Sequence, residues 1–476
     1  STGRIDEGIT RVDVGGTVDV ATGTFGAATV TKPVALSGAG TDETVIDGSG
    51  TGTGLAIGAG LSDVSVSDLT VTDFQDGITL TTGPLARISF TDVASIDNTR
   101  HGIWSQAFAV EDLSFVRVDA SRNGTAGNAG RGLWVINGEK SGITVVDGTF
   151  VDNGLVGIDI SDGNVTGLTI SGNTVTGNGD SGIGVLGATG PDANLVSGNT
   201  VEDNGRYGIE IKNSTGNGTT GPGSVVVSGN TVRRTVDATD ARDHAGIAVF
   251  RRAPTALNAD QPSGVVVDGN EVTGFTRKPV GATGDGFGIV VEGTGHVVTD
   301  NVLDGNDVAV QVQAFNVADQ QNTPYFDRGN AGASDAVVNR NVITTSGTAD
   351  LRNLAAPTID ATCNAYDAPT GPVPAKVVGG FVTSPFLIVQ DPDGVCGIPT
   401  DVEATAGDAS ATVTWEAPSP TSGAPITGYL VTAVPGGQTC VTGSTSCTVT
   451  GLTNGTQYRF TVAGTNATGP GQPSVA

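Results

Sequence analysis

Short runs of alternating apolar and polar residues, separated by Gly, Asn and Asp, recur along most of the chain and predict β-strands rather than helices. One unit repeats: a β-rich trio, Gly-Asn, a second β-rich stretch, a turn, and a Gly-Ile pair that opens another alternating strand. Clear copies occupy 168–187 and 194–213, and further copies begin at 225, 265, 296 and 337. One copy cannot bury its inward Val and Ile side chains alone, so we expect the copies to stack as parallel coils about 4.8 Å apart.

Asparagine marks the same bend in successive copies of the repeat. These residues are Asn173, Asn199, Asn230, Asn270, Asn301 and Asn341. An asparagine amide can satisfy backbone groups at a bend, and the residue tolerates left-handed dihedral angles. We therefore predict a structural ladder of asparagines and assign these residues no catalytic role.

The repeats resemble the parallel β-helix repeat family that includes pectate lyases, polygalacturonases, alginate epimerases and NosD-like proteins. The resemblance covers about residues 8–398 and implies an all-β fold with a right-handed parallel β-helix solenoid over 1–398. Segment 9–48 looks like the N-terminal capping coil of the family. Segment 358–372 is similar in part to the terminal coil of many secreted members.

A break in composition at 397–400 separates the repeats from a different kind of β-rich sequence. The segments 402–436 and 447–474 resemble a fibronectin type III domain, which implies a small β-sandwich over 401–476. In that fold Trp415 is the core tryptophan of the second strand. Tyr458, which follows Leu452 and Gly455, fits the tyrosine corner.

The four cysteines suit two disulfides formed in an oxidising compartment. They are Cys363, Cys396, Cys440 and Cys447, and they allow three pairings. Pairing between sequence neighbours is favoured because each bond then lies within one domain, and Cys440 with Cys447 would clip a hairpin. No CxxC motif or nearby histidine supports metal binding by these cysteines. We expect a secreted, extracellular protein in its mature form.

The charge balance excludes several classes of partner. The chain has 49 acidic residues and 23 Lys and Arg, for a net charge of −26. Binding to duplex DNA or to an anionic membrane needs basic residues, so we predict neither a nucleic-acid nor a membrane partner. No run of 18 apolar residues occurs, and no motif indicates a cofactor or a metal ion. The oligomeric state is left open.

Aligning the Gly-Ile strands places one column of residues on the outer face of the predicted sheet, because side chains alternate along a strand. The column contains Trp104, Trp134, Asp159, Gly184 and Glu210 in successive coils. The tryptophans would offer flat faces for stacking sugar rings. The two acids stand two coils apart, with their backbones about 9–10 Å from each other. That spacing suits the carboxylate pair of an inverting glycosidase, and the glycine between them leaves room for a substrate.

Long insertions flank the same predicted sheet and indicate a cleft along it. They occupy 213–223, 236–244, 251–262, 277–286 and 314–332. Insertions on one face of a solenoid usually mark its binding face. Basic residues gather here, and His101 and His244 each precede a Gly-Ile strand, where a histidine could act as an acid or base near neutral pH. The remaining candidates for substrate binding are Arg131, Arg206, Tyr207, Arg251 and Glu292.

These features predict a secreted carbohydrate-active enzyme that acts on a poly- or oligosaccharide. The first hypothesis is glycoside hydrolysis by Asp159 and Glu210, with Lys212 and Arg206 positioning the substrate. Segment 207–218 looks like the polygalacturonase Arg-Ile-Lys segment, but Glu210 stands where the family has arginine. The other polygalacturonase motifs do not follow in order, so that mechanism is not carried over.

Two alternatives remain. One is a polysaccharide lyase or epimerase acting on uronic acids, in which Lys212, Arg251 or His244 takes the C5 proton. The strongly negative net charge is less suited to such a polyanionic substrate. The other is a non-catalytic adhesin or glycan-binding solenoid, in which the polar groups of the cleft do not converge.

Overall fold

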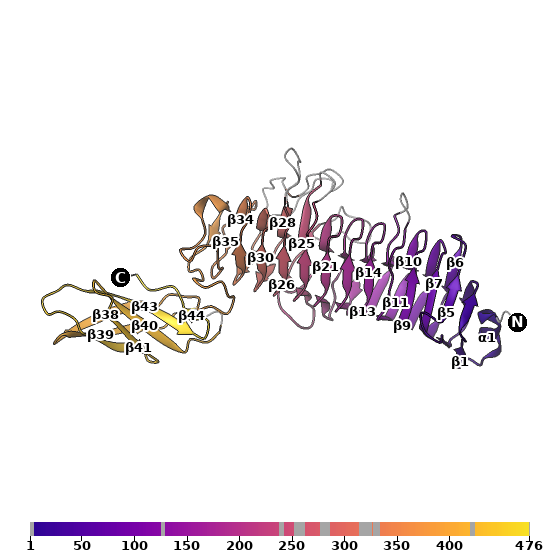
Figure 1. Ribbon diagram of the computed structural model, residues 1–476, viewed down its shortest axis with the longest axis horizontal. Helices are drawn as coiled ribbons and strands as arrows, with labels where there is room; N and C mark the ends of the chain where they lie inside the picture. The colour runs from indigo at the N-terminus through magenta and orange to yellow at the C-terminus, as the bar shows by residue number, and fades with distance from the viewer. Residues whose placement is uncertain are drawn as a thin grey trace.

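The computed structural model describes residues 4–124, 129–237, 242–251, 262–276, 286–313, 326, 334–418 and 424–475. Parallel coils stack into an elongated body, and a smaller antiparallel domain follows at its C-terminal end (Figure 1). The described residues contain one α-helix, α1 (Ile5–Arg11), and one 3-10 turn, η1 (Pro374–Lys376). No helix in these ranges is long and apolar enough to cross a bilayer. The predicted all-β class and the solenoid are therefore confirmed.

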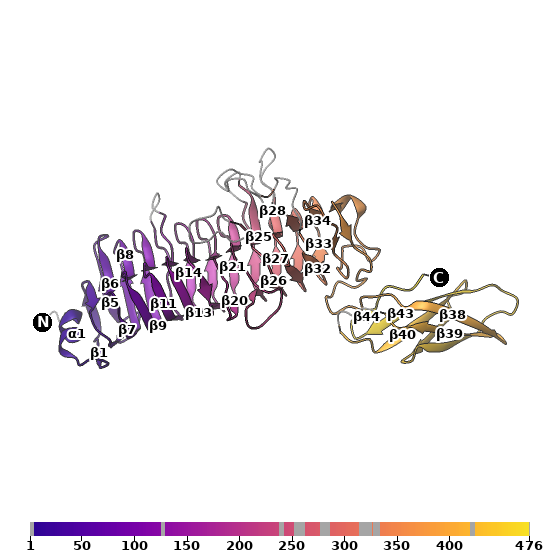
Figure 2. The same ribbon diagram turned by 180° about the vertical axis from the view of Figure 1, so that it is seen from behind.

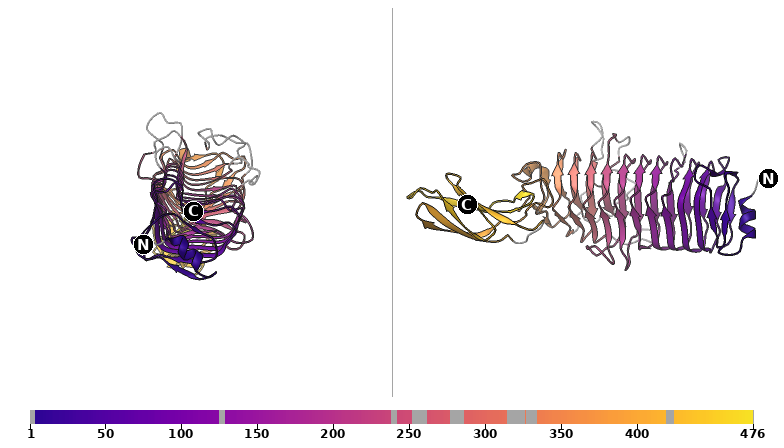
Figure 3. Two further views of the ribbon diagram at one scale, coloured as in Figure 1. Left: turned by 90° about the vertical axis from the view of Figure 1, so that its right-hand side faces the viewer. Right: turned by 60° about the horizontal axis from the view of Figure 1, so that its bottom comes forward.

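Three parallel sheets form the walls of the solenoid, and each coil adds one strand to most of them (Figures 2 and 3). The sheet that carries the Gly-Ile strands has 13 strands: β3 (Ala28–Val30), β6 (Thr53–Ile57), β8 (Asp76–Leu80), β10 (His101–Ser105), β12 (Leu133–Ile136), β15 (Ile158–Ser161), β19 (Ile183–Leu186), β22 (Tyr207–Lys212), β25 (His244–Phe250), β28 (Gly286–Glu292), β31 (Val308–Gln313), β34 (Ala349–Asn353) and β36 (Val377–Val378).

The second sheet has 17 strands: β1 (Thr17–Asp19), β2 (Gly23–Phe25), β4 (Ala35–Ser37), β5 (Thr44–Asp47), β7 (Ser62–Thr72), β9 (Pro84–Ile96), β11 (Ala109–Val116), β13 (Glu139–Val146), β16 (Val165–Thr166), β17 (Thr169–Ser171), β20 (Asn194–Ser197), β23 (Val225–Ser228), β26 (Val265–Asp268), β29 (Val297–Thr299), β32 (Val337–Asn339), β35 (Ile359–Asp360) and β37 (Phe381–Val382). The third sheet has seven: β14 (Thr149–Val151), β18 (Thr174–Thr176), β21 (Thr200–Glu202), β24 (Thr231–Arg233), β27 (Glu271–Thr273), β30 (Val302–Asp304) and β33 (Val342–Thr344).

The core is a continuous stack of inward Ile, Val and Leu side chains, as the alternating pattern predicts. On the Gly-Ile sheet one inward position is fully buried in nine successive coils. Its members are Ile78, Ile103, Leu133, Ile158, Ile183, Ile209, Ile247, Ile289 and Val310. Burying a side chain of this size contributes roughly 1.5–3 kcal/mol, and only the neighbouring coils supply the apolar surface that covers it.

The predicted asparagine ladder is confirmed and continues by one coil to Asn364. Each amide donates to a backbone carbonyl, and each side-chain oxygen accepts from the backbone N–H of the preceding rung; Asn230, for example, donates to Val196 O and accepts from Asn199 N. A second ladder, which we did not predict, follows the turn before the Gly-Ile sheet. It runs through Asn98, Asn123, Asn153, Asn178 and Asn204.

The residue before each rung of the first ladder has a left-handed backbone. Gly172 has φ of 68°, Asp300 has φ of 57° and Arg340 has φ of 59°; in earlier coils the equivalent residues Asp92 and Arg117 have φ of 53° and 50°. This geometry explains why the repeat reads Gly-Asn, since glycine adopts positive φ without steric cost. Where Arg and Asp occupy the column they form ion pairs between coils, such as Arg117 with Asp92 at 2.6 Å.

The C-terminal domain is the predicted β-sandwich. Its sheets contain β38 (Thr400–Gly407), β39 (Ser410–Glu416) and β42 (Ser446–Thr450), and β40 (Gly428–Val434), β41 (Thr439–Thr442), β43 (Arg459–Asn466) and β44 (Gly469–Pro470). Trp415 lies in the core, and the Tyr458 hydroxyl accepts the Thr453 N–H at 3.0 Å, as a tyrosine corner requires.

Both predicted disulfides are present, Cys363 with Cys396 and Cys440 with Cys447. The expected hairpin clip is wrong, because Cys440 lies on β41 and Cys447 on β42, which belong to different sheets. The second bond therefore joins the two layers of the sandwich.

Candidate functional site

The outer column on the Gly-Ile sheet has the register that the sequence predicts. Trp104 pairs with Trp134, Trp134 with Asp159, Asp159 with Gly184, and Gly184 with Glu210. These residues alternate with the inward core positions, so their side chains project from the outer face of the sheet. The sheet thus brings two acids and two tryptophans onto one outer surface.

Gly184 leaves a gap between the two carboxylates. A Cβ at this position would lie 3.0 Å from Glu210 Oε1 and 3.6 Å from Asp159 Oδ1. The two oxygens are consequently at most about 7 Å apart. This upper limit lies at the short end of the carboxyl spacing in inverting glycosidases, and it also allows the shorter spacing found in retaining glycosidases. Any side chain larger than glycine would fill the space between them.

Each carboxylate of the pair is held by its own cation. Arg131 Nε donates to Asp159 Oδ2 at 2.7 Å, and Lys212 Nζ donates to Glu210 Oε1 at 2.6 Å. The two acid side chains are only 8% and 9% exposed, so both ion pairs are largely shielded from solvent. Asp159 Oδ1, which faces the gap, has no hydrogen-bond partner among the described residues.

The gap opens into a pocket of about 210 Å³. Its lining combines three acids, three cations and apolar side chains: Arg131, Leu155, Val156, Asp159, Asp180, Arg206, Tyr207, Glu210, Lys212 and Phe250. Besides Asp159 and Glu210, four of the predicted site residues line it: Arg131, Arg206, Tyr207 and Lys212. Polar groups of both signs therefore converge on one small volume.

Asp180 contributes a further carboxyl to the pocket, and we did not predict it from the sequence. Burial raises its pKa, and the neighbouring charge of Glu210 raises it further, while Arg242 pairs with it at 3.2 Å. Asp180 lies in the turn before a Gly-Ile strand, between Leu155 and Arg206 of the adjacent coils. The sequence did contain a sign of this site residue, because the equivalent turn position in two other coils is also charged, as Arg100 and Arg206.

The two tryptophans stack on each other, with centroids 5.7 Å apart and an angle of 8° between the rings. Arg100 covers Trp104 at 4.7 Å from the side of the preceding coil, where it pairs with Asp76. Arg131 covers Trp134 at 4.1 Å from the side of Asp159. The predicted open stacking faces are therefore occupied, and both tryptophans are only partly exposed.

His101 packs against both tryptophans, with centroids 5.3 and 5.0 Å away, and its Nδ1 accepts the Arg131 N–H. Burial lowers its pKa to about 4, so the imidazole is neutral at ordinary pH. Tyr207 is 1% exposed and stacks beneath Arg206 at 4.5 Å, and burial raises the pKa of its phenol.

The other predicted site residues do not line the pocket. His244 is 2% exposed at the start of β25. Glu292 is fully buried, where it accepts from Gln313 Nε2 at 2.8 Å and from the Arg251 backbone N–H at 3.4 Å. The structure therefore places His244, Arg251 and Glu292 apart from the carboxylate pair, and their predicted roles remain untested.

An apolar cluster covers the outer face of the sheet beyond Glu210. Phe326 lies at its centre, fully buried, in edge contact with Phe250 at 5.7 Å and Phe287 at 5.5 Å. The outer column continues under this cluster as Ala248 and Val290, both fully buried. The surface predicted to run along the whole sheet therefore ends at the pocket.

Most of the predicted flanking insertions lie outside the described residues. The exception is 213–223, which is described throughout and follows Lys212. The remaining four insertions are described only in part, so the cleft they were expected to build stays a prediction.

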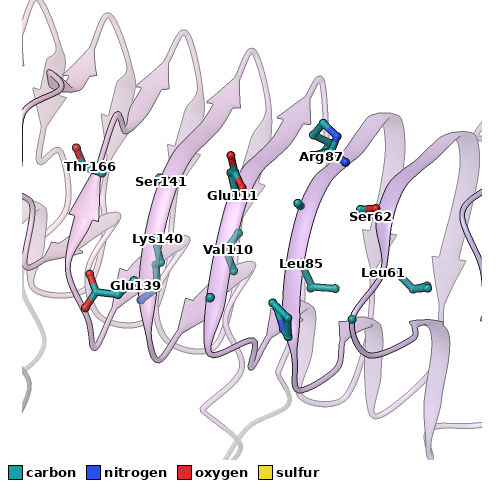
Figure 4. A pocket seen from close by; sticks show the side chains of 14 residues that line it. Leu61, Ser62, Leu85, Arg87, Val110, Glu111, Glu139, Lys140, Ser141 and Thr166 are labelled. Carbon is teal, nitrogen blue, oxygen red and sulfur yellow. The ribbon is translucent and has the colours of Figure 1, made fainter.

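A second concave surface crosses five coils of the 17-stranded sheet (Figure 4). It measures about 560 Å³, and Ser62, Arg87, Glu111 and Thr166 point across it. Lys140 lies beneath, 1% exposed, and donates to the Gly138 and Asp162 carbonyls at 3.0 and 3.3 Å. Arg87 is bound to Asp63 and Lys140 to backbone carbonyls. Fewer charged side chains therefore point toward a common space on this surface than in the smaller pocket.

Family comparisons agree with both halves of the chain. The profile described as periplasmic copper-binding protein (NosD) matches 41–235, and the fibronectin type III profile matches 397–476. Residues 41–235 are thus similar to NosD proteins, within a parallel β-helix that a fibronectin type III domain follows.

Several solved structures are similar to this chain. The periplasmic alginate epimerase AlgG is 15% identical over 74% of this chain and 85% of its own, with a TM-score of 0.37. Pectate lyase Pel9A is 12% identical over 80% and 72%, with a TM-score of 0.24. The tailspike of E. coli bacteriophage HK620 is 11% identical over 94% and 80%, with a TM-score of 0.37. Titin kinase with its flanking domains is 27% identical, but the match spans only 17% of this chain and 16% of titin's, with a TM-score of 0.15.

The residues of this chain do not fit a copper site. Copper favours Met, Cys and His ligands, but the chain has no Met, three His, and four Cys that are all in disulfides. His101 and His244 lie on strands separated by four others in the sheet. Among the described residues, no three His, Cys, Asp or Glu side chains are grouped to hold a metal ion.

Proposed function

We propose that the protein is a carbohydrate-active enzyme, and specifically a glycoside hydrolase that cleaves a poly- or oligosaccharide at the gap above Gly184. One observation carries the proposal: Asp159 and Glu210 face each other across the gap, and a third carboxyl with a raised pKa, Asp180, lines the same pocket. Carboxyl groups whose environments push their pKa values apart are the usual acid and base of glycoside hydrolysis.

We assign a role to each carboxyl. Asp180, whose pKa is raised by burial, donates a proton to the glycosidic oxygen as the bond to the anomeric carbon breaks. Asp159 Oδ1, which has no partner among the described residues, either takes a proton from the attacking water or attacks the anomeric carbon itself. Glu210, which is paired with Lys212, stabilises the positive charge that develops on the sugar and raises the pKa of Asp180.

A second candidate is a lyase or epimerase acting on uronic acids. It is favoured by the three cations that line the pocket, Arg131, Arg206 and Lys212, which could neutralise a substrate carboxylate. However, Lys212 Nζ donates to Glu210 Oε1 at 2.6 Å, so the nitrogen that would take the C5 proton is already engaged with a carboxylate. The hydrolase is therefore the first choice.

The test is a glycan panel assayed with purified full-length protein, followed by variants on the substrate found. Asp159→Asn, Asp180→Asn and Glu210→Gln each remove a carboxyl with little change in shape, and each is expected to lower kcat at least about 100-fold. Asp192→Asn, an exposed acid outside the pocket, is the matched control and should keep full activity. Wild-type turnover in all three variants would refute the assignment.

Product chemistry separates the alternatives. Hydrolysis releases a saturated sugar with a new reducing end, whereas a lyase releases an unsaturated sugar that absorbs ultraviolet light. Saturable binding of a glycan with no turnover would instead indicate the non-catalytic glycan-binding solenoid. The two disulfides fit an extracellular or periplasmic protein, and we propose that it is secreted.

A further inference from the structure

We propose that the pocket takes the terminal sugar of a glycan chain, so that the enzyme acts from chain ends and releases one sugar at a time. This inference rests on the proposed hydrolase function and adds its mode of attack. It depends on the shape of the surface around the carboxylates, rather than on the carboxylates themselves.

One end of the outer column is closed by protein. A glycan lying along the column would have to pass over Ala248, Val290 and Gln311 to continue beyond Glu210, and all three are fully buried. Phe326 occupies the space above them, and its backbone carbonyl accepts from Gln311 Nε2 at 2.7 Å. The chain of the substrate therefore ends at this wall.

Phe326 is fixed in this position by more than apolar contact. Its backbone N–H donates to Asp243 Oδ2 at 2.8 Å, and its ring contacts Tyr207 at 5.9 Å as well as Phe250. Tyr207 and Phe250 also line the pocket. The wall and the pocket consequently share side chains, and the wall is part of the site.

The pocket has room for little more than one sugar ring. Its volume of about 210 Å³ is below the roughly 300 Å³ at which pockets for drug-sized ligands begin. The strands that carry the two carboxylates stand two coil steps, about 10 Å, apart, and the facing carboxylate oxygens are at most about 7 Å apart. One ring bound against the wall thus places its glycosidic bond near the gap above Gly184.

The opposite end of the column is open enough to receive the rest of the chain. Trp104 and Trp134 are partly exposed there, before the pocket is reached. We expect the remaining sugars to lie over a floor formed by these two tryptophans and Arg131. Because the aromatic wall closes one end of the site and the floor leaves the other end open, a glycan chain would bind with its terminal sugar at the wall.

The experiment uses the full-length protein and the linear polysaccharide that the glycan panel identifies, with and without a fluorescent label on its reducing end. Products are separated by size during the first few per cent of the reaction, and viscosity is followed in parallel. Chain-end action predicts a monosaccharide in more than tenfold molar excess over every longer product, with viscosity falling slowly. Early oligosaccharides with a rapid loss of viscosity would overturn the inference while leaving the hydrolase proposal intact. Absence of hydrolysis on every glycan would overturn both.

A variant tests the wall itself. Phe326→Ala is expected to open the far end of the column and raise the share of disaccharide and longer products at least fivefold. Phe326→Leu keeps the space filled and should still release monosaccharide. Phe150→Ala removes an equally buried aromatic ring from a strand of the third sheet, and controls for general loss of packing. A product profile in Phe326→Ala identical to that of the wild type would show that Phe326 does not close the site.

Discussion

Replacing Asn230 by alanine tests how the asparagine ladder supports the solenoid. The side chain makes four hydrogen bonds: Nδ2 donates to Val196 O and Asn270 Oδ1, and Oδ1 accepts from the backbone N–H and the Nδ2 of Asn199, all at 2.9 Å. Asn230 itself is 1% exposed, so water does not replace these partners at once.

The magnitude follows from the groups left unpaired. Asn230→Ala strands two buried backbone groups, the Asn199 N–H and the Val196 carbonyl, and each unsatisfied group costs about 1–3 kcal/mol. The β-helix should therefore lose about 2–6 kcal/mol of stability. Asn164→Ala, at an exposed position whose amide makes one contact of 3.2 Å to Glu139, should change stability by less than about 0.5 kcal/mol.

Two measurements check this prediction. Urea denaturation compares the unfolding midpoints of both variants with that of the wild type, and the fibronectin type III domain serves as an internal reference. Because a coiled repeat can unfold in parts, hydrogen exchange at the Asn199 amide gives the local answer, and we expect exchange about 5- to 150-fold faster in Asn230→Ala. An unchanged midpoint together with unchanged protection of the Asn199 amide would refute the argument that the ladder satisfies otherwise stranded backbone groups.

Three further predictions concern other parts of the molecule. Burial lowers the pKa of His101 and of His296 from 6.5 to about 4, so these side chains bind protons at higher pH in the unfolded chain than in the folded one. Thermal unfolding should therefore show the β-helix losing stability as the pH falls from about 6.5 to 4. The fibronectin type III domain has no histidine and should not share this loss. Arg117→Gly should be about 1 kcal/mol more stable to urea than Arg117→Ala, because both lose the exposed ion pair to Asp92 but only glycine relieves the positive φ; equal midpoints would contradict this. Tyr458→Phe should lower the stability of the C-terminal domain by about 1 kcal/mol in calorimetry, through loss of the tyrosine-corner hydrogen bond, and no shift would show that the bond contributes nothing.

Much of the fold could be predicted because its signals are local and repeated. A strand alternates with a period of two residues, so each Gly-Ile pair determines which side chains face inward for the whole coil. The same reasoning placed Trp134, Asp159, Gly184 and Glu210 on one outer column, and the observed register agrees. The asparagine ladder followed from one amide recurring at one bend.

The features that were missed depend on how far side chains reach between coils. The open tryptophan faces were expected from outward direction alone, but Arg100 and Arg131 extend from their turns to cover them. Asp180 joins the site from a turn that the strand alignment did not include. Cys440 and Cys447 connect two sheets because strand pairing places their strands in different layers.

By itself the sequence determined the coil, its inward and outward faces, the rungs of asparagine, the disulfide partners and the sandwich that follows. These are properties of backbone period and of residues a few positions apart. Only the tertiary structure decided where the outer column is open and where it is closed. Phe326 lies far along the chain from Tyr207 and Phe250, yet it packs against both and ends the surface at the pocket. Such a contact has no periodic signature, because it joins side chains that are far apart in the sequence and belong to no common repeat position.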